Sequence, residues 1–249
     1  MRRVHVIGIG AGDPGYVTAQ AVDALNDVDV FFASDKGAVK DDLVSLRREI
    51  CERFIREPRY RFVELADPPR SKDTPDGTAY RRVVSDWHAA RAELWADALR
   101  DELADDGVGA FLAWGDPSLY DSTLRILDMI GDRVEFTYDV IPGITAIQAL
   151  TARHRIPLND VGAPVLVTTG RRLREEGLSG TAVVMLDGDQ AFLDCPPTTR
   201  IWWGAYLGTP KELLVAGTVA EVGDRIATVR AEARERHGWI MDVYLLRSG

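Results

Sequence analysis

The sequence contains little cysteine, and its hydrophobic runs are short. Only Cys51 and Cys195 occur among the 249 residues, and they lie far apart. Two separated cysteines supply neither a disulfide framework nor a zinc site, which favours a reducing cytoplasm. No apolar run approaches the roughly 18 residues that a membrane-spanning helix needs. We therefore expect a cytoplasmic protein with no metal site and no membrane partner.

Basic residues are also in deficit. The chain has 30 Lys and Arg against 39 Asp and Glu, a formal net charge of −9. A general nucleic-acid binder needs a basic surface, so no nucleic-acid partner is expected. An anionic small molecule would have to be held by a local cluster of arginine or lysine. The composition is otherwise globular, with 46% hydrophobic and 28% charged residues.

Short apolar segments alternate with amphipathic ones, which predicts α/β architecture with mostly parallel sheets. The pattern pauses near residues 156–164, so we expect two domains, residues 1–155 and 156–249. The predicted strands of the first domain are 4–8, 28–32, 108–114 and 134–141, with a long helix over 83–103. The second has predicted strands at 165–169, 183–186, 201–203 and 243–246, and a charged helix over 226–236.

Ligands of parallel sheets bind at loops beyond the carboxyl ends of strands. Residues 8–16 form one such loop, whose glycines permit positive φ and close approach of a ligand. Its nearest generic match is the G-x-G-x-x-G fingerprint of NAD(P)-dependent oxidoreductases. The match is poor, because Asp13 stands at the last glycine position and would repel a pyrophosphate. A tight strand-to-helix turn is an equally good interpretation.

Two further loops qualify by residue type. In residues 114–121, Pro117 stiffens the backbone after Gly115 and Asp116, and flanking aromatic residues could wall an apolar ligand. In residues 142–146, Thr145 could cap the next helix or donate to a ligand. Each of these loops by itself is explained as well by an ordinary turn or helix start.

Together, Gly8–Pro14, Gly115–Pro117 and Pro142–Ala146, in this order and near this spacing, resemble the tetrapyrrole (corrin/porphyrin) methylases. Residues 209–219 resemble the closing motif of that family, so the resemblance spans nearly the whole chain. It implies a mostly parallel N-terminal sheet, a mixed C-terminal sheet, an active site in the cleft between the domains, and a homodimer. It also implies methyl transfer from S-adenosylmethionine to a tetrapyrrole carbon.

The resemblance implies a cofactor site built from both domains. The implied residues are Gly115, Asp116, Leu119, Thr145, Ala146, Met185, Leu186, Tyr206, Leu207, Met241 and Asp242. Adenine suits an apolar slot with a few backbone hydrogen bonds, which strand ends can offer. The loop residues Gly10, Ala11, Gly12 and Asp13 would face the tetrapyrrole. Many family members have proline where this chain has Ala11, which makes the loop less rigid here.

Residues 111–127 and 237–246 look like the branch of the family that methylates carbon 1 of a precorrin and releases an acetyl group as acetate. Water must then attack a ketone, which requires a general base and an oxyanion stabiliser. By residue type, the candidates are Asp121, Tyr120, Asp13 and His88. Asp121 could equally cap the next helix, and His88 lies in a long helix where a packed or surface histidine is the simpler interpretation. Arg171 and Arg172 could bind substrate carboxylates, or lie in a solvated loop balanced by neighbouring glutamates.

Other functions stay open from the sequence alone. Within the family, the chain could be another precorrin methylase or a diphthine synthase. Outside it, a nicotinamide-dependent oxidoreductase and a non-catalytic corrinoid-binding protein are the alternatives. Binding of S-adenosylhomocysteine without binding of NAD(P)H would separate the methylase from the oxidoreductase.

Overall fold

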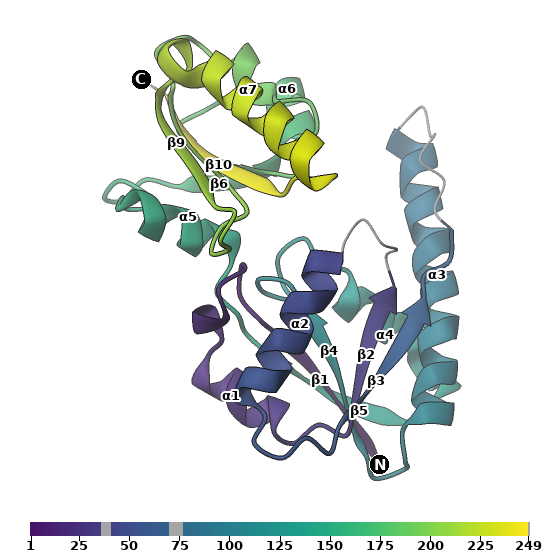
Figure 1. The fold of residues 1–249 in the computed structure, drawn as a ribbon. Helices are drawn as coiled ribbons and strands as arrows, with labels where there is room; N and C mark the ends of the chain where they lie inside the picture. The colour runs from purple at the N-terminus through teal and green to yellow at the C-terminus, as the bar shows by residue number, and fades with distance from the viewer. Residues whose placement is uncertain (36–40, 70–76, 249) are drawn as a thin grey trace. The chain divides into compact units, whose positions relative to one another are not determined.

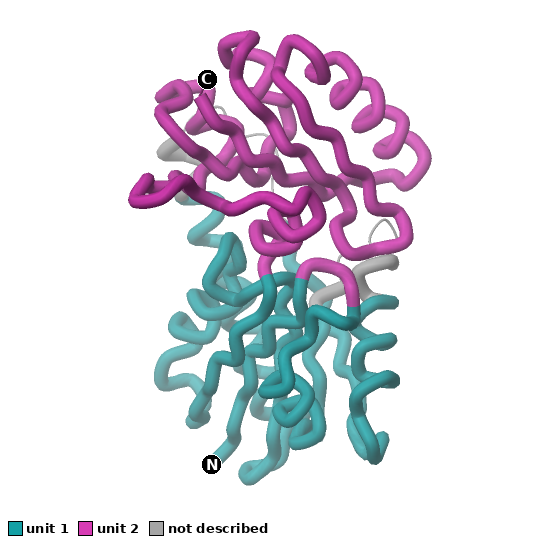
Figure 2. The backbone as a smooth tube through the Cα atoms, turned by 90° about the vertical axis from the view of Figure 1, so that its left-hand side faces the viewer, with its two compact units in different colours: residues 1–10, 14–144 teal, residues 11–13, 145–249 magenta. Residues whose placement is uncertain are grey.

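The computed structural model describes residues 1–35, 41–69 and 77–248. The chain divides into two compact units, residues 1–10 with 14–144 and residues 11–13 with 145–249 (Figure 2). The first unit thus ends after residue 144, before the boundary at 155 expected from the sequence. The reason is that α5 (Ala146–His154) packs against strands of the second sheet. Its last residue, His154, places Nε2 3.0 Å from the carbonyl oxygen of Trp203.

The first unit is built on a parallel five-stranded sheet. Its strands are β1 (Arg2–Gly8), β2 (Val30–Asp35), β3 (Arg61–Ala66), β4 (Val108–Ala113) and β5 (Phe136–Ile141). They lie in the order β3-β2-β4-β1-β5, and every neighbouring pair is parallel. The central strands β1 and β4 are buried on both faces, which is why they consist of continuous apolar runs.

Two pairs of helices cover this sheet (Figure 1). On one face, α1 (Ala19–Leu25) and α2 (Asp41–Phe54) enclose a core that includes Leu25 and Phe31. On the other face, α3 (Gly77–Glu102) and α4 (Thr123–Ile130) enclose Trp95 and Ile126. The hydroxyl of Thr18 accepts the N–H of Ala21 at 3.1 Å and so caps α1.

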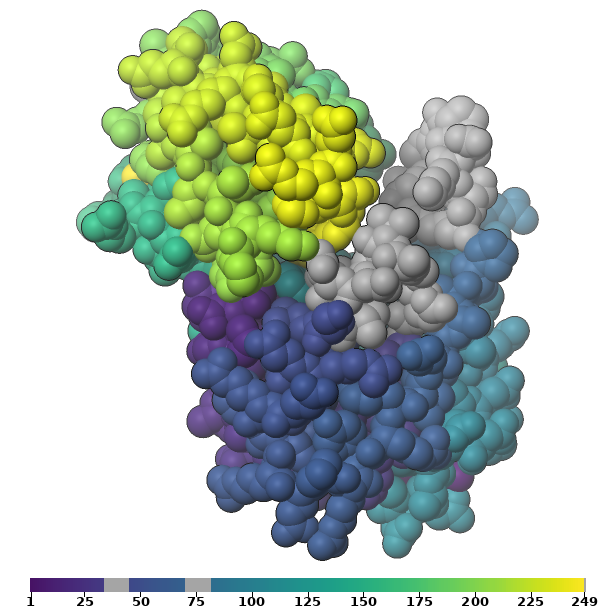
Figure 3. All heavy atoms as spheres, in the orientation of Figure 1, coloured from purple at the N-terminus to yellow at the C-terminus, as the bar shows by residue number. Residues whose placement is uncertain are grey.

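The second unit has a mixed five-stranded sheet in the order β6-β7-β10-β8-β9. The strands are β6 (Val165–Thr169), β7 (Thr181–Met185), β8 (Arg200–Ala205), β9 (Leu213–Thr218) and β10 (Asp242–Arg247). Strand β10 is antiparallel to both of its neighbours, β7 and β8. α6 (Gly170–Glu176) and α7 (Val219–His237) pack over a core around Trp203 and Tyr244. α7 lies in front of this sheet in the view of Figure 1, and its yellow-green atoms are on the face turned to the viewer in Figure 3.

Two elements of the second unit differ from the sequence prediction. α7 begins at Val219 and not at residue 226, because Thr218 and Glu221 form a capping box that starts the helix directly after β9. Arg171 and Arg172, for which a solvated loop was one interpretation, lie in the short helix α6, which Thr169 caps. Within the described residues no helix is long and apolar enough to cross a membrane.

Candidate active site

The three loops singled out from the sequence meet at the carboxyl edge of the first sheet. They follow β1, β4 and β5, which are adjacent and parallel. The N–H of Gly115 donates to the oxygen of Gly10 at 2.8 Å, and the N–H of Gly10 donates back at 3.2 Å. A Cβ on Gly143 would lie 2.0 Å from the oxygen of Gly115 and 2.9 Å from Cα of Gly8. These four residues, the glycine junction, leave no room for a side chain.

Asp116 ties this junction together. Its Oδ2 accepts the N–H of Gly143 at 2.8 Å, and its Oδ1 accepts both the N–H and the hydroxyl of Ser118. Burial raises the pKa of Asp116, but these hydrogen bonds outweigh burial and hold the pKa below its usual range. The predicted cofactor residue Leu119 closes the same turn, because its N–H donates to the oxygen of Asp116. The carboxylate therefore shapes the loop through the protein's own backbone.

Tyr120 and Asp121, the candidates for acetyl removal, follow that turn. Tyr120 has a φ of 52° and its residue is 47% exposed. A non-glycine residue in this conformation is strained by about 1–3 kcal/mol, and such residues cluster at functional sites. Oδ1 of Asp121 accepts the N–H of Thr123 at 2.7 Å, so the capping contact is present. That contact does not test whether Asp121 also acts on a substrate.

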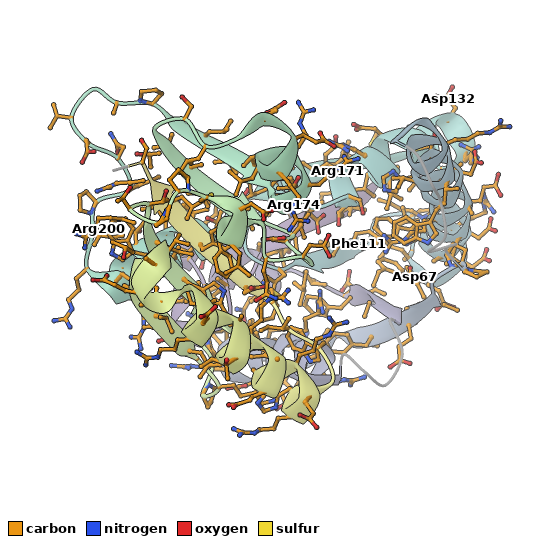
Figure 4. The ribbon with its side chains drawn as sticks, turned by 90° about the horizontal axis from the view of Figure 1, so that it is seen from above. Asp67, Phe111, Asp132, Arg171, Arg174 and Arg200 are labelled. Carbon is orange, nitrogen blue, oxygen red and sulfur yellow. The ribbon has the colours of Figure 1, made fainter. Side chains whose placement is uncertain are left out.

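Arg91 is a buried charge that the sequence analysis did not single out. It lies on α3, is 5% exposed, and sits 4.6 Å and 4.8 Å from the ring centroids of Trp87 and Trp95. Its Nε lies 2.9 Å from Oδ1 of Asp67, in the segment after β3 (Figure 4). Burial lowers the pKa of Arg91, while the charges of Asp67 and Asp121 raise it. The four-residue spacing from Trp87 through Arg91 to Trp95 is the signal that could have identified this contact.

A second arginine approaches the same loop from the opposite face of the sheet. Arg47 lies on α2, and its Nε donates to the oxygen of Leu112 near the end of β4 at 3.1 Å. Burial lowers the pKa of Arg47, and the negative charge of Asp121 raises it. Arg91 also donates from Nη1 to the hydroxyl of Ser122 at 3.4 Å. Arg47 therefore contacts the end of β4 before the loop, and Arg91 contacts Ser122 directly after the predicted catalytic residues.

Six predicted cofactor residues gather at one edge of the second sheet. Strands β7 and β8 end at this edge and β10 begins there, because β10 is antiparallel to both. The residues are Met185 and Leu186 after β7, Tyr206 and Leu207 after β8, and Met241 and Asp242 at the start of β10. The structure therefore brings together, in one unit, positions that lie up to 57 residues apart in the chain (242 minus 185).

Several polar groups at this edge are occupied by the protein itself. The N–H of Tyr206 donates to the oxygen of Met241 at 3.0 Å, and its hydroxyl donates to the oxygen of Trp239. Oδ2 of Asp242 accepts from Trp203 Nε1 at 2.9 Å and from Arg230 Nε at 3.0 Å. Burial raises the pKa of Asp242, against the opposing influence of Arg230. Tyr206 and Asp242 thus stabilise the strand ends.

Leu186 differs from its neighbours at this edge. Its φ is 54° and it is 67% exposed, although it directly follows the buried strand β7. A large apolar side chain held out from a strand end in a strained conformation is suited to contact a ligand. A ligand role for Leu186 stays a prediction.

The remaining predicted residues occupy three different settings. Residues 11–13 belong to the second unit, where a Cβ on Gly12 would lie 2.3 Å from the oxygen of Leu207. Ala11 is buried and Asp13 is half-buried. Thr145 and Ala146 begin α5, and Thr145 caps it by accepting the N–H of Ile147 at 3.1 Å. The structure shows these packing and capping contacts, and roles toward a ligand stay predictions.

Arg171 and Arg172 lie in the first turn of α6, after β6 (Figure 4 labels Arg171). Arg172 pairs with Glu176 at 2.6 Å and with Glu175 at 3.6 Å. Both arginines are exposed, and exposed pairs of this kind contribute little stability. The pairing favours the solvated interpretation for Arg172 and leaves Arg171 as the better candidate for a substrate carboxylate.

The model of the tetrapyrrole (corrin/porphyrin) methylases matches residues 3–223. The chain belongs to this family. It is 53% identical over 254 residues to precorrin-6A synthase (deacetylating) of Sinorhizobium sp, covering 100% of this chain and 96% of that protein. It is 31% identical over 206 residues to precorrin-2 C(20)-methyltransferase of the same organism, covering 75% and 74%.

Solved structures of similar proteins share the fold. A cobalamin synthesis related protein (CobF) from Corynebacterium diphtheriae is 42% identical, with a TM-score of 0.86 over 99% of this chain and 98% of that one. Uroporphyrin-III C-methyltransferase from Thermus thermophilus, complexed with S-adenosylhomocysteine, is 17% identical with a TM-score of 0.58, covering 98% and 92%. The two-domain α/β fold with one parallel and one mixed sheet is thus confirmed.

The alternative of a dinucleotide enzyme finds no support in the geometry. After the glycines the chain forms a 3-10 turn at Pro14–Tyr16, and α1 begins only at Ala19. The helix N-terminus therefore does not meet the glycine loop, as binding of a pyrophosphate requires. Among the described side chains, no group of three or more His, Cys, Asp or Glu residues could hold a metal ion.

Proposed function

We propose that this chain is an S-adenosylmethionine-dependent C-methyltransferase of cobalamin biosynthesis. It methylates carbon 1 of precorrin-5 and releases the acetyl group as acetate, giving precorrin-6A. The observation that carries the proposal is full-length identity of 53% to a deacetylating precorrin-6A synthase. Within the second unit, the exposed Leu186 at the end of β7 offers an apolar surface that suits an adenine ring.

The residues toward the cofactor divide into two groups. Gly115, Asp116 and Leu119 would hold one part of it at the first sheet, and the strand-end edge around Leu186 would hold the adenine. When bound, S-adenosylmethionine supplies a methyl group that is already activated as a sulfonium. The protein then needs chiefly to orient the acceptor carbon. Orientation of this kind can lower the activation free energy by at most about 7–11 kcal/mol.

Acetyl removal demands more of the side chains. Water adds to the acetyl carbonyl carbon, the bond from that carbon to carbon 1 breaks, and its electron pair stays on carbon 1, where it accepts the methyl group. The proton of the water passes to a base. We assign this step to Asp121 and Tyr120, because Tyr120 is held exposed in a strained conformation and Asp121 directly follows it.

The test is incubation of the purified protein with precorrin-5 and S-adenosylmethionine, followed by mass analysis and acetate measurement. One methyl gained and one acetate released per corrinoid is the expected result. Methyl transfer without acetate would instead indicate another precorrin methylase. Asp121→Asn keeps a capping side chain and should lower acetate release about 100-fold, which is typical for loss of a general base.

Tyr120→Phe tests the neighbouring hydroxyl in the same assay. Tyr138→Phe is the matched control. Tyr138 lies on edge strand β5, and its hydroxyl donates to Asp128 at 2.7 Å. Both catalytic variants should bind S-adenosylhomocysteine as the parent does. Parent-like acetate release by both variants would remove Tyr120 and Asp121 from the chemistry without touching the methylase assignment.

We also propose that the protein works in the cytoplasm as a homodimer. Both cysteines are free thiols, as a reducing compartment permits. Leu166 and Val167 on edge strand β6 are 47% and 38% exposed, which favours self-association. Light scattering coupled to size-exclusion chromatography should give a mass of about twice the 27.5 kDa of one chain. A monomer at micromolar concentration would contradict the dimer.

A further inference from the structure

The loop after β7 is held in an unusual conformation around a buried carboxylate. Leu186 and Gln190, neither of them glycine, have φ values of 54° and 58°. Between them lies Asp187, which is only 7% exposed. Its Oδ1 accepts the N–H of Asp189 at 3.0 Å, and its Oδ2 accepts the N–H of Ala191 at 2.7 Å. The carboxylate therefore holds the backbone of the loop that contains both strained residues.

Groups from three other elements complete this arrangement. The hydroxyl of Tyr244 on β10 donates to Oδ2 of Asp187 at 2.6 Å. Nη2 of Arg230 on α7 donates to the backbone oxygen of Asp187 at 2.8 Å, and its Nε donates to Asp242. On α6, Gly170 leaves space for the carboxylate, because a Cβ there would lie 2.2 Å from Oδ1. We call this arrangement of Asp187, Tyr244 and Arg230 the Asp187 hub.

A strand-to-helix connection does not by itself require such a centre. Burying a carboxylate is unfavourable unless its oxygens are hydrogen-bonded, and left-handed leucine is strained. The consequence of the hub is that Leu186 is held in place next to the buried Asp187 with 67% of the residue exposed. Arg230 also holds Asp242, so the hub joins the loop after β7 to the start of β10. These are two of the three segments assigned to the adenine.

We propose that Asp187 is a positioning residue for the cofactor, which with Tyr244 and Arg230 fixes Leu186 as an apolar wall for the adenosyl group. This inference rests on the proposed function, since it assumes that the second unit binds S-adenosylmethionine. Asp187 itself does not touch the ligand. It acts by holding a neighbour in a conformation that a leucine rarely adopts.

The first test removes one hydroxyl from the hub. Tyr244→Phe takes away the donor to Asp187 and should weaken S-adenosylhomocysteine binding, measured by titration calorimetry on the full chain, about five- to tenfold. The KM for S-adenosylmethionine should rise while kcat stays near the parent value. Tyr138→Phe is again the control, because it loses a tyrosine–aspartate bond in the other unit and should leave the dissociation constant unchanged.

The second test separates positioning from stability. Leu186→Gly removes the wall and relieves the left-handed strain, so the thermal midpoint should stay level or rise while the ligand binds more weakly. Leu193→Ala, at another exposed leucine of the same unit, is the control and should leave ligand binding unchanged. Parent-like dissociation constants in both Tyr244→Phe and Leu186→Gly would overturn the inference. A parent protein that binds no S-adenosylhomocysteine would instead refute the proposed cofactor.

Discussion

Asp116→Ala should destabilise the first unit as well as weaken cofactor binding. By sequence, this loop lies outside the core and the fold should stay nearly intact. The structure gives a reason to expect a loss of stability, because the carboxylate accepts the N–H of Gly143 in the glycine junction. Removing it leaves that half-buried donor without its partner. The neighbouring donors of Ser118 are exposed and can turn to water.

The magnitude follows from these contacts. A hydrogen bond to a charged group contributes about 1.5–3 kcal/mol, and partial exposure of the pair reduces this, so a loss of about 1–2 kcal/mol is expected. Ser118→Ala, the control, removes only the exposed hydroxyl and should cost less than about 0.5 kcal/mol. Urea unfolding at pH 7, followed by tryptophan fluorescence, measures the difference directly.

The same contact has a definite pH dependence. Because the folded pKa of Asp116 is depressed, its contribution is complete above the ordinary value of 3.8 and is lost as the pH falls through the folded pKa. The stability gap between the parent and Asp116→Ala should therefore be constant from pH 5 to 8 and narrow below about pH 4. An Asp116→Ala variant as stable as the parent at pH 7 would refute this reasoning. Weaker ligand binding at unchanged stability would mean that Asp116 contacts the ligand directly.

Further predictions concern the junction and the cysteines. Gly143→Ala should cost about 3 kcal/mol or more in unfolding free energy, because backbone atoms that cannot move aside lie 2.0–2.9 Å from the new methyl. Gly188→Ala, where the new Cβ meets nothing within 4 Å and φ is not positive, should cost less than about 0.5 kcal/mol, and equal losses in the two variants would contradict the crowding. Cys51, whose pKa burial raises to about 12, should resist a thiol reagent at pH 8 until the chain unfolds; rapid native labelling would count against that burial.

Much of the fold was predictable because its signals are local. The buried strands β1 and β4 are continuous apolar runs, and Thr18 is a capping residue directly before an amphipathic segment. Hydrophobic periodicity and capping act over a few residues, so the sequence displays them openly. The start of α7 was missed because the predicted helix relied on its charged part, while Thr218 and Glu221 form the actual capping box.

The candidate site was predictable only in outline. Three loops with glycine and proline at strand ends could be recognised, and family resemblance named the residues around them. The hydrogen-bond partners of these residues could not be predicted, because Asp116 bonds to Gly143 and Asp187 to Tyr244 across long stretches of chain. Arg91 had a visible helical spacing to two tryptophans, but its pairing with Asp67 depends on how α3 lies beside β3.

The sequence by itself determined the class of fold, the family and the three loops, since these follow from local residue patterns. The tertiary structure decided what the site residues do. It made Asp116 a tie within the glycine junction, made Tyr206 and Asp242 supports of a strand edge, and left Leu186 exposed above a buried carboxylate. The physical reason is that hydrogen bonds and close packing join groups by position in space, and residues distant in sequence carry no local sign of meeting.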